Sequence, residues 1–207
     1  MAMKPIIFST PMVQAILNGC KTQTRRVMKP QPRLETYRNP ERDFWIWEDC
    51  NWLDGGLGFP KSGIEDYAPY KPGDILWVRE AFWVHNDDPL DSYKNIIYDA
   101  DYGDGHKTPD RWLPQWYNRK PSITMPKAAA RIYLRVTDVK VERVQEILCG
   151  DMKAEGCIPA HIKGGQWQQW QRDYFEPMWN RTNAKRGYPW HANPWVWKIE
   201  FERTEKP

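Results

Sequence analysis

Apolar residues along the chain form short strand-like runs separated by a few stretches with helical spacing. Residues 5–8 are mostly apolar and predict a strand. Ser9-Thr10-Pro11 then predicts a helix start. The N–H groups of the first helical turn have no acceptor within the helix, so the N–H that proline lacks is not needed there. The apolar positions 12, 13, 16 and 17 fall on one face of this helix. Gly19 is predicted to end the helix in a left-handed conformation, and Lys21 to Val27 leave it in an extended direction.

The remaining pattern contains more strands than helices. Strand patterns occupy residues 75–84, 95–100, 129–144 and 195–201, and helical patterns occupy 145–155 and 165–179. Two Trp-rich stretches, 29–70 and 103–120, have no regular periodicity and are predicted to be insertions, with one hairpin around 44–52. We expect a single α+β domain over residues 1–207, built as a small β-barrel flanked by helices. The first and last strands are expected to pair.

Composition limits the classes of function. The chain has 13 Trp and 10 Tyr among 207 residues, which excludes a disordered chain. Its net charge of only +3 argues against a long duplex-binding track. The cysteines and histidines lack zinc-site spacing, so no metal and no cofactor are expected. No signal peptide and no run of 18 apolar residues stand out, which predicts a cytoplasmic protein without a membrane anchor.

Hydrogen-bond donors are dense in the segment Gly19-Cys20-Lys21-Thr22-Gln23-Thr24-Arg25-Arg26. Such a segment can hold an anion or the edge of a base, although a solvated basic turn has the same composition. Side chains alternate between the two faces of a strand, so Lys21 and Thr24 would point in opposite directions in a flat strand. They can share a pocket only if the chain bends between them.

This segment resembles the Gly-x-Lys-Thr-x-Thr-x-Arg signature of the ASCH domain, a family with a PUA-like β-barrel. Three later segments resemble the same family, and the whole is similar to the Trp-rich ASCH proteins of phages and prophages. These segments are Lys71-Pro72-Gly73-Asp74 with the strand after it, Asp151-Met152-Lys153-Ala154-Glu155-Gly156, and the closing strand after Asn193-Pro194. The two insertions have no obvious counterpart in the small bacterial members.

The resemblance implies three alternative functions. Some small ASCH proteins are amidohydrolases that remove the acetyl group of N4-acetylcytidine, and others are RNA-binding modules or ribonucleases. Carried over by position, the catalytic set of the amidohydrolases falls on Lys21, Thr24 and Glu155. The Thr24 hydroxyl would be the nucleophile, the Lys21 amine its base and Glu155 the proton donor to the leaving amine. A ribonuclease would use Lys21 with Arg25 and Arg26, but the motif lacks a histidine to carry protons.

Substrate-binding roles are expected for the other polar residues near the motif, namely Thr22, Arg25, Arg26 and Glu80. Glu80 follows the strand pattern of residues 75–84, where an internal Arg–Glu pair is the structural alternative. For Glu155 the alternative is a salt bridge, with Lys21 as one possible partner. The expected partner is a nucleoside, a modified base or RNA, and nothing in the sequence indicates the oligomeric state.

The tryptophans divide into two groups. Trp77, Trp195 and Trp197 lie on predicted strands and are expected in the core. The tryptophans of the two insertions either pack these loops down or offer flat rings on which bases stack. These are Trp45, Trp47, Trp52, Trp112 and Trp116.

Overall fold

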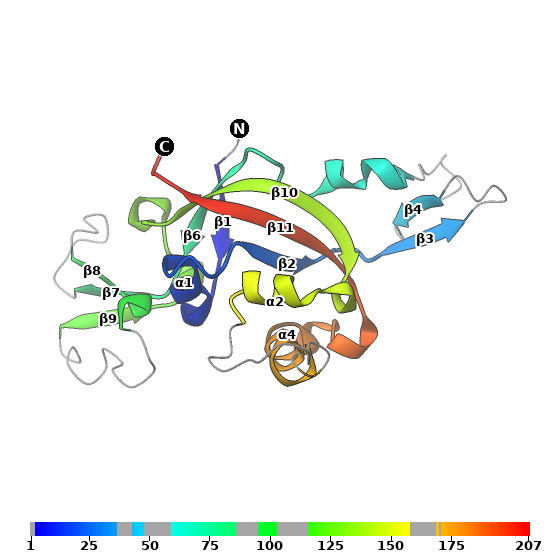
Figure 1. Ribbon diagram of the computed structural model, residues 1–207. Coiled ribbons are helices and arrows are strands. Elements are labelled where there is room, and N and C mark those ends of the chain that lie inside the picture. Colours follow the sequence, from blue (N-terminus) through cyan, green and yellow to red (C-terminus); the bar gives the residue numbers. More distant parts are fainter. Residues whose placement is uncertain are drawn as a thin grey trace. The chain divides into compact units, whose positions relative to one another are not determined.

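The structure is a computed structural model, and it describes residues 3–36, 43–47, 59–85, 95–102, 116–157, 169 and 171–207. The chain divides into two compact units. The first unit comprises Met1–Thr22, Gly73–Val136 and Phe201–Pro207, and the second comprises Gln23–Pro72 and Thr137–Glu200. Two long strands contribute residues to both units, and these are β10 (Tyr133–Arg143) and β11 (Trp195–Thr204) (Figure 1).

The first unit begins with the predicted strand and helix. Its elements are β1 (Met3–Ile7), α1 (Thr10–Leu17), β6 (Ile75–Arg79), β7 (Phe82–His85), β8 (Ile96–Tyr98) and β9 (Tyr117–Lys120). Ser9 is extended and Pro11 stands in the first turn of α1, as the sequence predicts. Val13 and Ile16 are buried, and Gly19 has a φ of 72°. The expected left-handed end of the helix is therefore confirmed.

The strand predicted over residues 75–84 is two strands. β6 lies parallel to β1 and antiparallel to β10, whereas β7 lies between β8 and β9 in a separate three-stranded sheet (Figure 1). The chain changes sheets at Glu80 and Ala81, both of which are buried. The apolar run is continuous because both strands have buried faces, so hydrophobicity alone could not locate the break.

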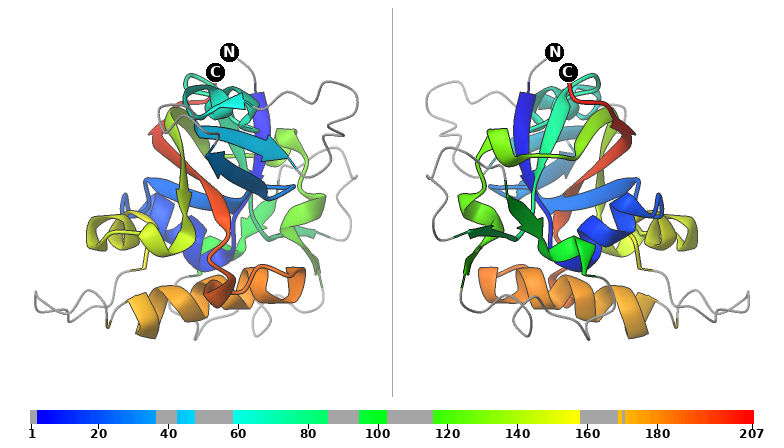
Figure 2. Two further views of the ribbon diagram at one scale, coloured as in Figure 1. Left: turned by 90° about the vertical axis from the view of Figure 1, so that its right-hand side faces the viewer. Right: turned by 90° about the vertical axis from the view of Figure 1, so that its left-hand side faces the viewer.

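The second unit contains the motif strand and the helices that pack near it. Its elements are β2 (Gln23–Val27), β3 (Pro32–Thr36), β4 (Asp43–Trp47), β5 (Phe59–Pro60), α2 (Cys149–Ala154) and α4 (Glu176–Asn183). A core of aromatic and aliphatic side chains joins α2 and α4 to β11, and it includes Met152, Phe175, Trp179, Trp190 and Val196. Figures 1 and 2 both show α4 beneath α2.

The α+β class predicted from the sequence is confirmed. The five-stranded sheet has the order β1-β6-β10-β11-β2, and β3-β4-β5 and β8-β7-β9 form the three-stranded sheets. Among the described strands these orders do not close into a barrel. The expected pairing of the first and last strands is wrong, because β6 and β10 stand between β1 and β11. Ile132, Leu134 and Val136 are buried as predicted, but Tyr133 between them is buried too, in a core cluster with Ile75 and Ala130.

The two stretches predicted to be irregular contain more strand than expected. In residues 29–70, β3, β4 and β5 pair antiparallel, so the hairpin lies earlier than 44–52 and has a third strand. Residues 117–120 form β9, which pairs with β7. Residues 103–115 and Trp52 lie outside the described residues. The helix predicted over 145–155 begins later than expected, at Cys149. Within the second predicted helix, 165–179, residue 169 is helical and a π-helical turn leads into α4 at Glu176.

Short helical segments connect these elements. The 3₁₀ segments are Lys61–Tyr67, Asp99–Asp101, Ser122–Thr124, Lys127–Ala129, Val144–Glu146, Ala184–Arg186 and Trp190–Ala192. A π-helical turn, Gln171–Phe175, leads into α4. The 3₁₀ segment Trp190–Ala192 forms part of the core of the second unit, because Trp190 packs edge-on against Phe175 with ring centroids 5.7 Å apart.

Candidate functional site

The second half of the motif forms β2, and both faces of that strand are covered. Gln23, Thr24 and Arg25 are all buried although they are consecutive and polar. The register places Arg25 opposite Lys198 of β11 and Thr24 opposite Ile199. Residues opposite each other in an antiparallel pair share a face, so this pair of strands has one charged face, with Arg25, and one mainly apolar face, with Thr24.

The charged face of β2 is built around Arg25. Its guanidinium donates from Nε to Glu142 at 2.6 Å, from Nη2 to Asp151 at 2.8 Å and from Nη1 to Glu155 at 3.1 Å. We call Arg25 and these three carboxylates the Arg25 cluster. The Arg25 side chain is only 1% exposed. Burial alone would lower the pKa of Arg25, but the three carboxylates outweigh it and raise that pKa. Arg25 is therefore a fixed positive centre.

Asp151 connects this cluster to a second cation. Its other oxygen accepts a hydrogen bond from Lys198 Nζ at 2.9 Å, and its backbone carbonyl accepts one from Gln23 at 3.0 Å. Burial would raise the pKa of Asp151, but the Lys198 hydrogen bond and the charge of Arg25 lower it from 3.8 to about 2. Asp151 and Glu155 are four residues apart, which places both carboxylates on one side of α2.

Glu155 ends α2 and is buried, with 3% of the residue exposed. It lies close enough to act electrostatically on Arg26 as well as on Arg25, although these neighbours point to opposite faces of β2. A carboxylate beside the edge of a strand can do this, and β2 is the last strand in its sheet order. The predicted alternative role of Glu155, a salt bridge, is therefore present, and Arg25 is one partner.

Arg26 is half-buried on the same face of β2 as Thr24. Burial lowers the pKa of Arg26, Tyr70 and Glu155 act to raise it, and Arg186 acts to lower it further. Burial in turn raises the pKa of the Tyr70 hydroxyl, against the charge of Arg26. Tyr70 and Arg186, both in the second unit, therefore lie near the guanidinium of Arg26. Such donors suit an anion or the polar edge of a base.

The first half of the motif belongs to the first unit. Lys21 is 2% exposed, and its ammonium group lies 5.4 Å from the centre of the Phe8 ring. The face of an aromatic ring attracts a cation electrostatically, and this attraction partly offsets the cost of burying the Lys21 ammonium group. Thr22 is exposed and its carbonyl accepts a hydrogen bond from Phe201 N–H at 2.8 Å. Whether the chain bends enough to bring Lys21 and Thr24 into one pocket stays a prediction.

Glu80 also lies in the first unit, at the point where the chain changes sheets. Its two oxygens accept hydrogen bonds from Arg131 Nε and Nη2 at 2.9 and 3.0 Å, and Arg131 Nη1 donates to Asp101 at 2.7 Å. The Arg131 guanidinium lies 3.8 Å from the centre of the Tyr98 ring. Burial raises the pKa of Glu80 despite the hydrogen bonds and charge of Arg131. The internal Arg–Glu pair weighed in the sequence is present, with Arg131 as the arginine.

Sequence reasoning missed the partners that hold the motif in place. Asp151 lies in a segment that resembles the family, and its spacing from Glu155 was the available signal. Glu142 and Lys198 gave no such signal. Lys198 lies on β11, which pairs with β2, and Glu142 lies on β10, the strand beyond β11, so only the fold brings them to Arg25.

Neither a metal site nor a membrane-spanning helix is found among the described residues. No group of three or more His, Cys, Asp or Glu residues there is arranged to hold a metal ion. None of the described helices combines the length and apolar character needed to cross a membrane.

Comparisons with known proteins return structural likenesses alone. No protein-family model matches the chain, and no curated protein matches it either. The chain is similar to a crystal structure of an ASCH domain from Lactobacillus crispatus, at 10% identity over 99% of this chain and 81% of that one, with a TM-score of 0.40. It is also similar to a DUF984 protein from Enterococcus faecalis, at 10% identity over 99% and 77%, with a TM-score of 0.43. The first of these structures carries the same family name, ASCH, as the motif resemblance.

Proposed function

We propose that this protein acts on a nucleobase or nucleoside, and that its reaction is hydrolysis of the amide of an N4-acylated cytidine. One observation carries the proposal. Arg25, the chain neighbour of Thr24, holds the buried carboxylate of Glu155 at 3.1 Å across 130 residues of sequence. Two of the three residues that the ASCH resemblance assigns to catalysis are thereby attached to one strand and the helix packed against it.

The proposed reaction has two steps. Thr24 Oγ attacks the acyl carbonyl while the Lys21 amine takes the hydroxyl proton. The bond between the carbonyl carbon and N4 then breaks, and N4 leaves with a proton from Glu155. Water next hydrolyses the acyl-threonine ester, which releases the carboxylic acid and restores the hydroxyl. In this scheme Arg26 and Tyr70 bind the substrate, and Arg25 positions Glu155.

The test is release of acetate and cytidine from N4-acetylcytidine by the purified protein. Thr24→Val removes the hydroxyl and keeps the shape, and we expect a loss of at least about 1,000-fold in kcat/KM. Glu155→Gln should lose about 100-fold or more, as expected for a missing proton donor. Lys153→Ala, an exposed position on α2, is the matched control and should keep full activity. No turnover by the unaltered protein, or full turnover by Thr24→Val, would contradict the proposal.

A second candidate function is recognition of cytidine without turnover. The contact between Glu155 and Arg25 favours it, because the arginine holds the carboxylate of Glu155 in one position as a hydrogen-bond acceptor. An ionised carboxylate accepts hydrogen bonds from the exocyclic amine of cytosine. In calorimetry this function predicts binding of cytidine, weaker binding of uridine, and no acetate release from N4-acetylcytidine.

A further inference from the structure

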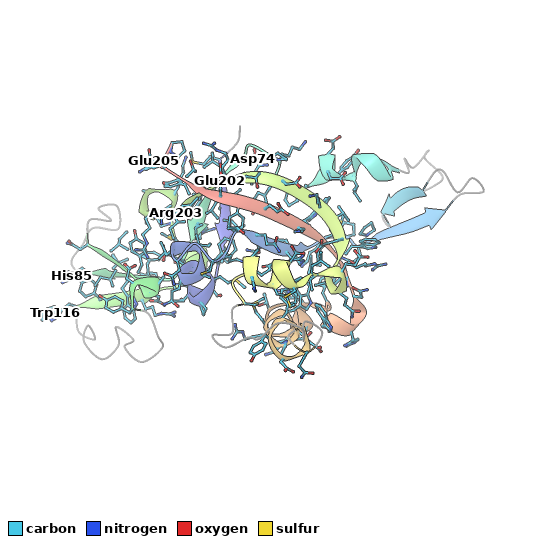
Figure 3. The ribbon with its side chains drawn as sticks, viewed as in Figure 1. Asp74, His85, Trp116, Glu202, Arg203 and Glu205 are labelled. Carbon is cyan, nitrogen blue, oxygen red and sulfur yellow. The ribbon has the colours of Figure 1, made fainter. Side chains whose placement is uncertain are left out.

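An exposed aromatic pair lies at the end of the β7–β9 ladder, apart from the motif residues. Trp116 and His85 stack with nearly parallel rings, 5° apart and with centroids separated by 6.5 Å. Tyr117 meets His85 edge-on, with ring centroids 5.0 Å apart. Figure 3 shows His85 and Trp116 together at the outer end of this sheet. We call these three residues the aromatic platform.

Trp116 is unusual among the tryptophans of this protein. It is 59% exposed, whereas the other tryptophans whose side chains the structure describes are buried or half-buried. The sheet beneath it has its own core on the other face, formed by Phe82, Met125 and Ala129. An indole left this exposed loses the burial that normally stabilises tryptophan in a fold. A flat, accessible ring at this position is therefore suited to a flat ligand.

Positive charge accompanies the platform along β9. The strand reads Tyr-Asn-Arg-Lys and has no acidic residue. Its register pairs His85 with Tyr117 and Trp83 with Arg119, so Arg119 shares the face of the platform. Asp99 accepts hydrogen bonds from Arg119 Nε and Nη2 at 3.0 and 2.6 Å, while 52% of the Arg119 side chain stays exposed. The guanidinium is held in place and retains its Nη1 donors.

Stacking on an aromatic ring requires an unpaired base, since a duplex hides its base faces. We propose that the aromatic platform and Arg119 form a binding site for single-stranded nucleic acid, with one base stacked on Trp116 and a neighbouring phosphate on Arg119. None of these residues belongs to the proposed catalytic set, so the site does not depend on turnover.

The test is fluorescence anisotropy of a labelled octamer of adenylate RNA titrated with the full chain at low salt. Trp116→Ala should weaken binding about 10- to 100-fold, as removal of a stacking ring does, and Trp116→Phe should recover most of that loss. Arg119→Gln should weaken binding and lower the slope of log K against log salt by about 0.7, the value for one phosphate on a single strand. Tyr174→Ala, which changes an exposed ring of the second unit, is the matched control and should bind normally.

Three results would overturn the site. These are no binding of the octamer by the unaltered protein, equal binding of an RNA duplex of the same length, and unchanged affinity in Trp116→Ala. A Trp116→Ala protein with a normal melting temperature and weakened binding supports it, because the exposed ring then matters to the ligand and not to the fold. If the unaltered protein binds the octamer but releases no acetate from N4-acetylcytidine, that result contradicts the proposed reaction and leaves the binding site standing.

Discussion

Each compact unit pairs carboxylates with an arginine, but only the second unit buries its arginine. In the second unit the Arg25 side chain is 1% exposed, while Glu142 and Asp151 keep 17% and 14%. In the first unit Glu80 is 1% exposed and Arg131 keeps 27%. Glu155 is also buried, at 3%, so the second unit buries the cation together with one of its carboxylates, whereas the first unit buries only the anion of its pair.

This difference determines how each unit offsets the cost of burying a charged group. A guanidinium cannot lose its proton in a protein, so Arg25 needs a surplus of carboxylates to offset its desolvation. A carboxyl group can take up a proton, and burial already raises the pKa of Glu80 in spite of Arg131. Arg25 is therefore permanently charged, whereas the charge of Glu80 depends on pH.

The largest effect is expected from Arg25→Met. It leaves Glu142, Asp151 and Glu155 close together without their common cation, and we expect a loss of about 3–5 kcal/mol in the free energy of unfolding. Urea denaturation at neutral pH measures it. Arg135→Met is the control, because Arg135 makes only a long, exposed pair with Glu202 at 3.6 Å. A loss for Arg25→Met no larger than that of the control would show that the cluster is not needed for stability.

Arg131→Met should cost less and should depend on pH. The variant leaves Glu80 buried without its arginine, and we expect a loss of about 2–3 kcal/mol at neutral pH, because Arg131 is partly solvated. Lowering the pH protonates Glu80, so the loss should shrink towards pH 4. Urea denaturation of Arg131→Met and of the unaltered protein at pH 7 and pH 4 measures this, and a loss of equal size at the two pH values would contradict the protonation of Glu80.

The sequence predicted elements whose signals are local. Pro11 and Gly19 delimit α1 because their backbone constraints act within a few residues. The alternation at Ile132, Leu134 and Val136 marked β10 for the same reason. The break at Glu80 could not be predicted, because both strands beside it are apolar and only their different partners separate them.

The candidate site shows the same limit. The motif named Arg25 as a substrate-binding residue, whereas the structure surrounds it with carboxylates from β10 and α2. Pairing across more than 100 residues has no local signal. The spacing of Asp151 and Glu155 is local, and could have indicated that one cation serves both.

Asp151 supplies a smaller, pH-dependent contribution. Its pKa falls from 3.8 to about 2 in the folded protein, so it stabilises the fold fully above its unfolded pKa, and this stability is lost as the pH falls towards 2. The shift corresponds to about 2 kcal/mol. We expect the unfolding free energy of the unaltered protein to fall more steeply between pH 5 and pH 2 than that of Asp151→Asn. Burial raises the pKa of Glu142, so Glu142 makes the unfolding free energy change with pH in the direction opposite to Asp151, and it does so in both proteins. Parallel curves for the two proteins would contradict the shift.

The smallest effect is expected at a pair with equally short geometry. Lys140 Nζ lies 2.6 Å from Asp138, the same distance as Arg25 Nε from Glu142, but the Lys140 and Asp138 side chains are 61% and 40% exposed. Water already solvates both charges, so a double-mutant cycle with Asp138→Ala and Lys140→Ala should give a coupling below about 1 kcal/mol, and 1 M salt should remove most of it. The same cycle on Arg25 and Glu142 should give a larger coupling that salt changes little. Equal couplings would mean that distance, and not burial, sets the strength of these pairs.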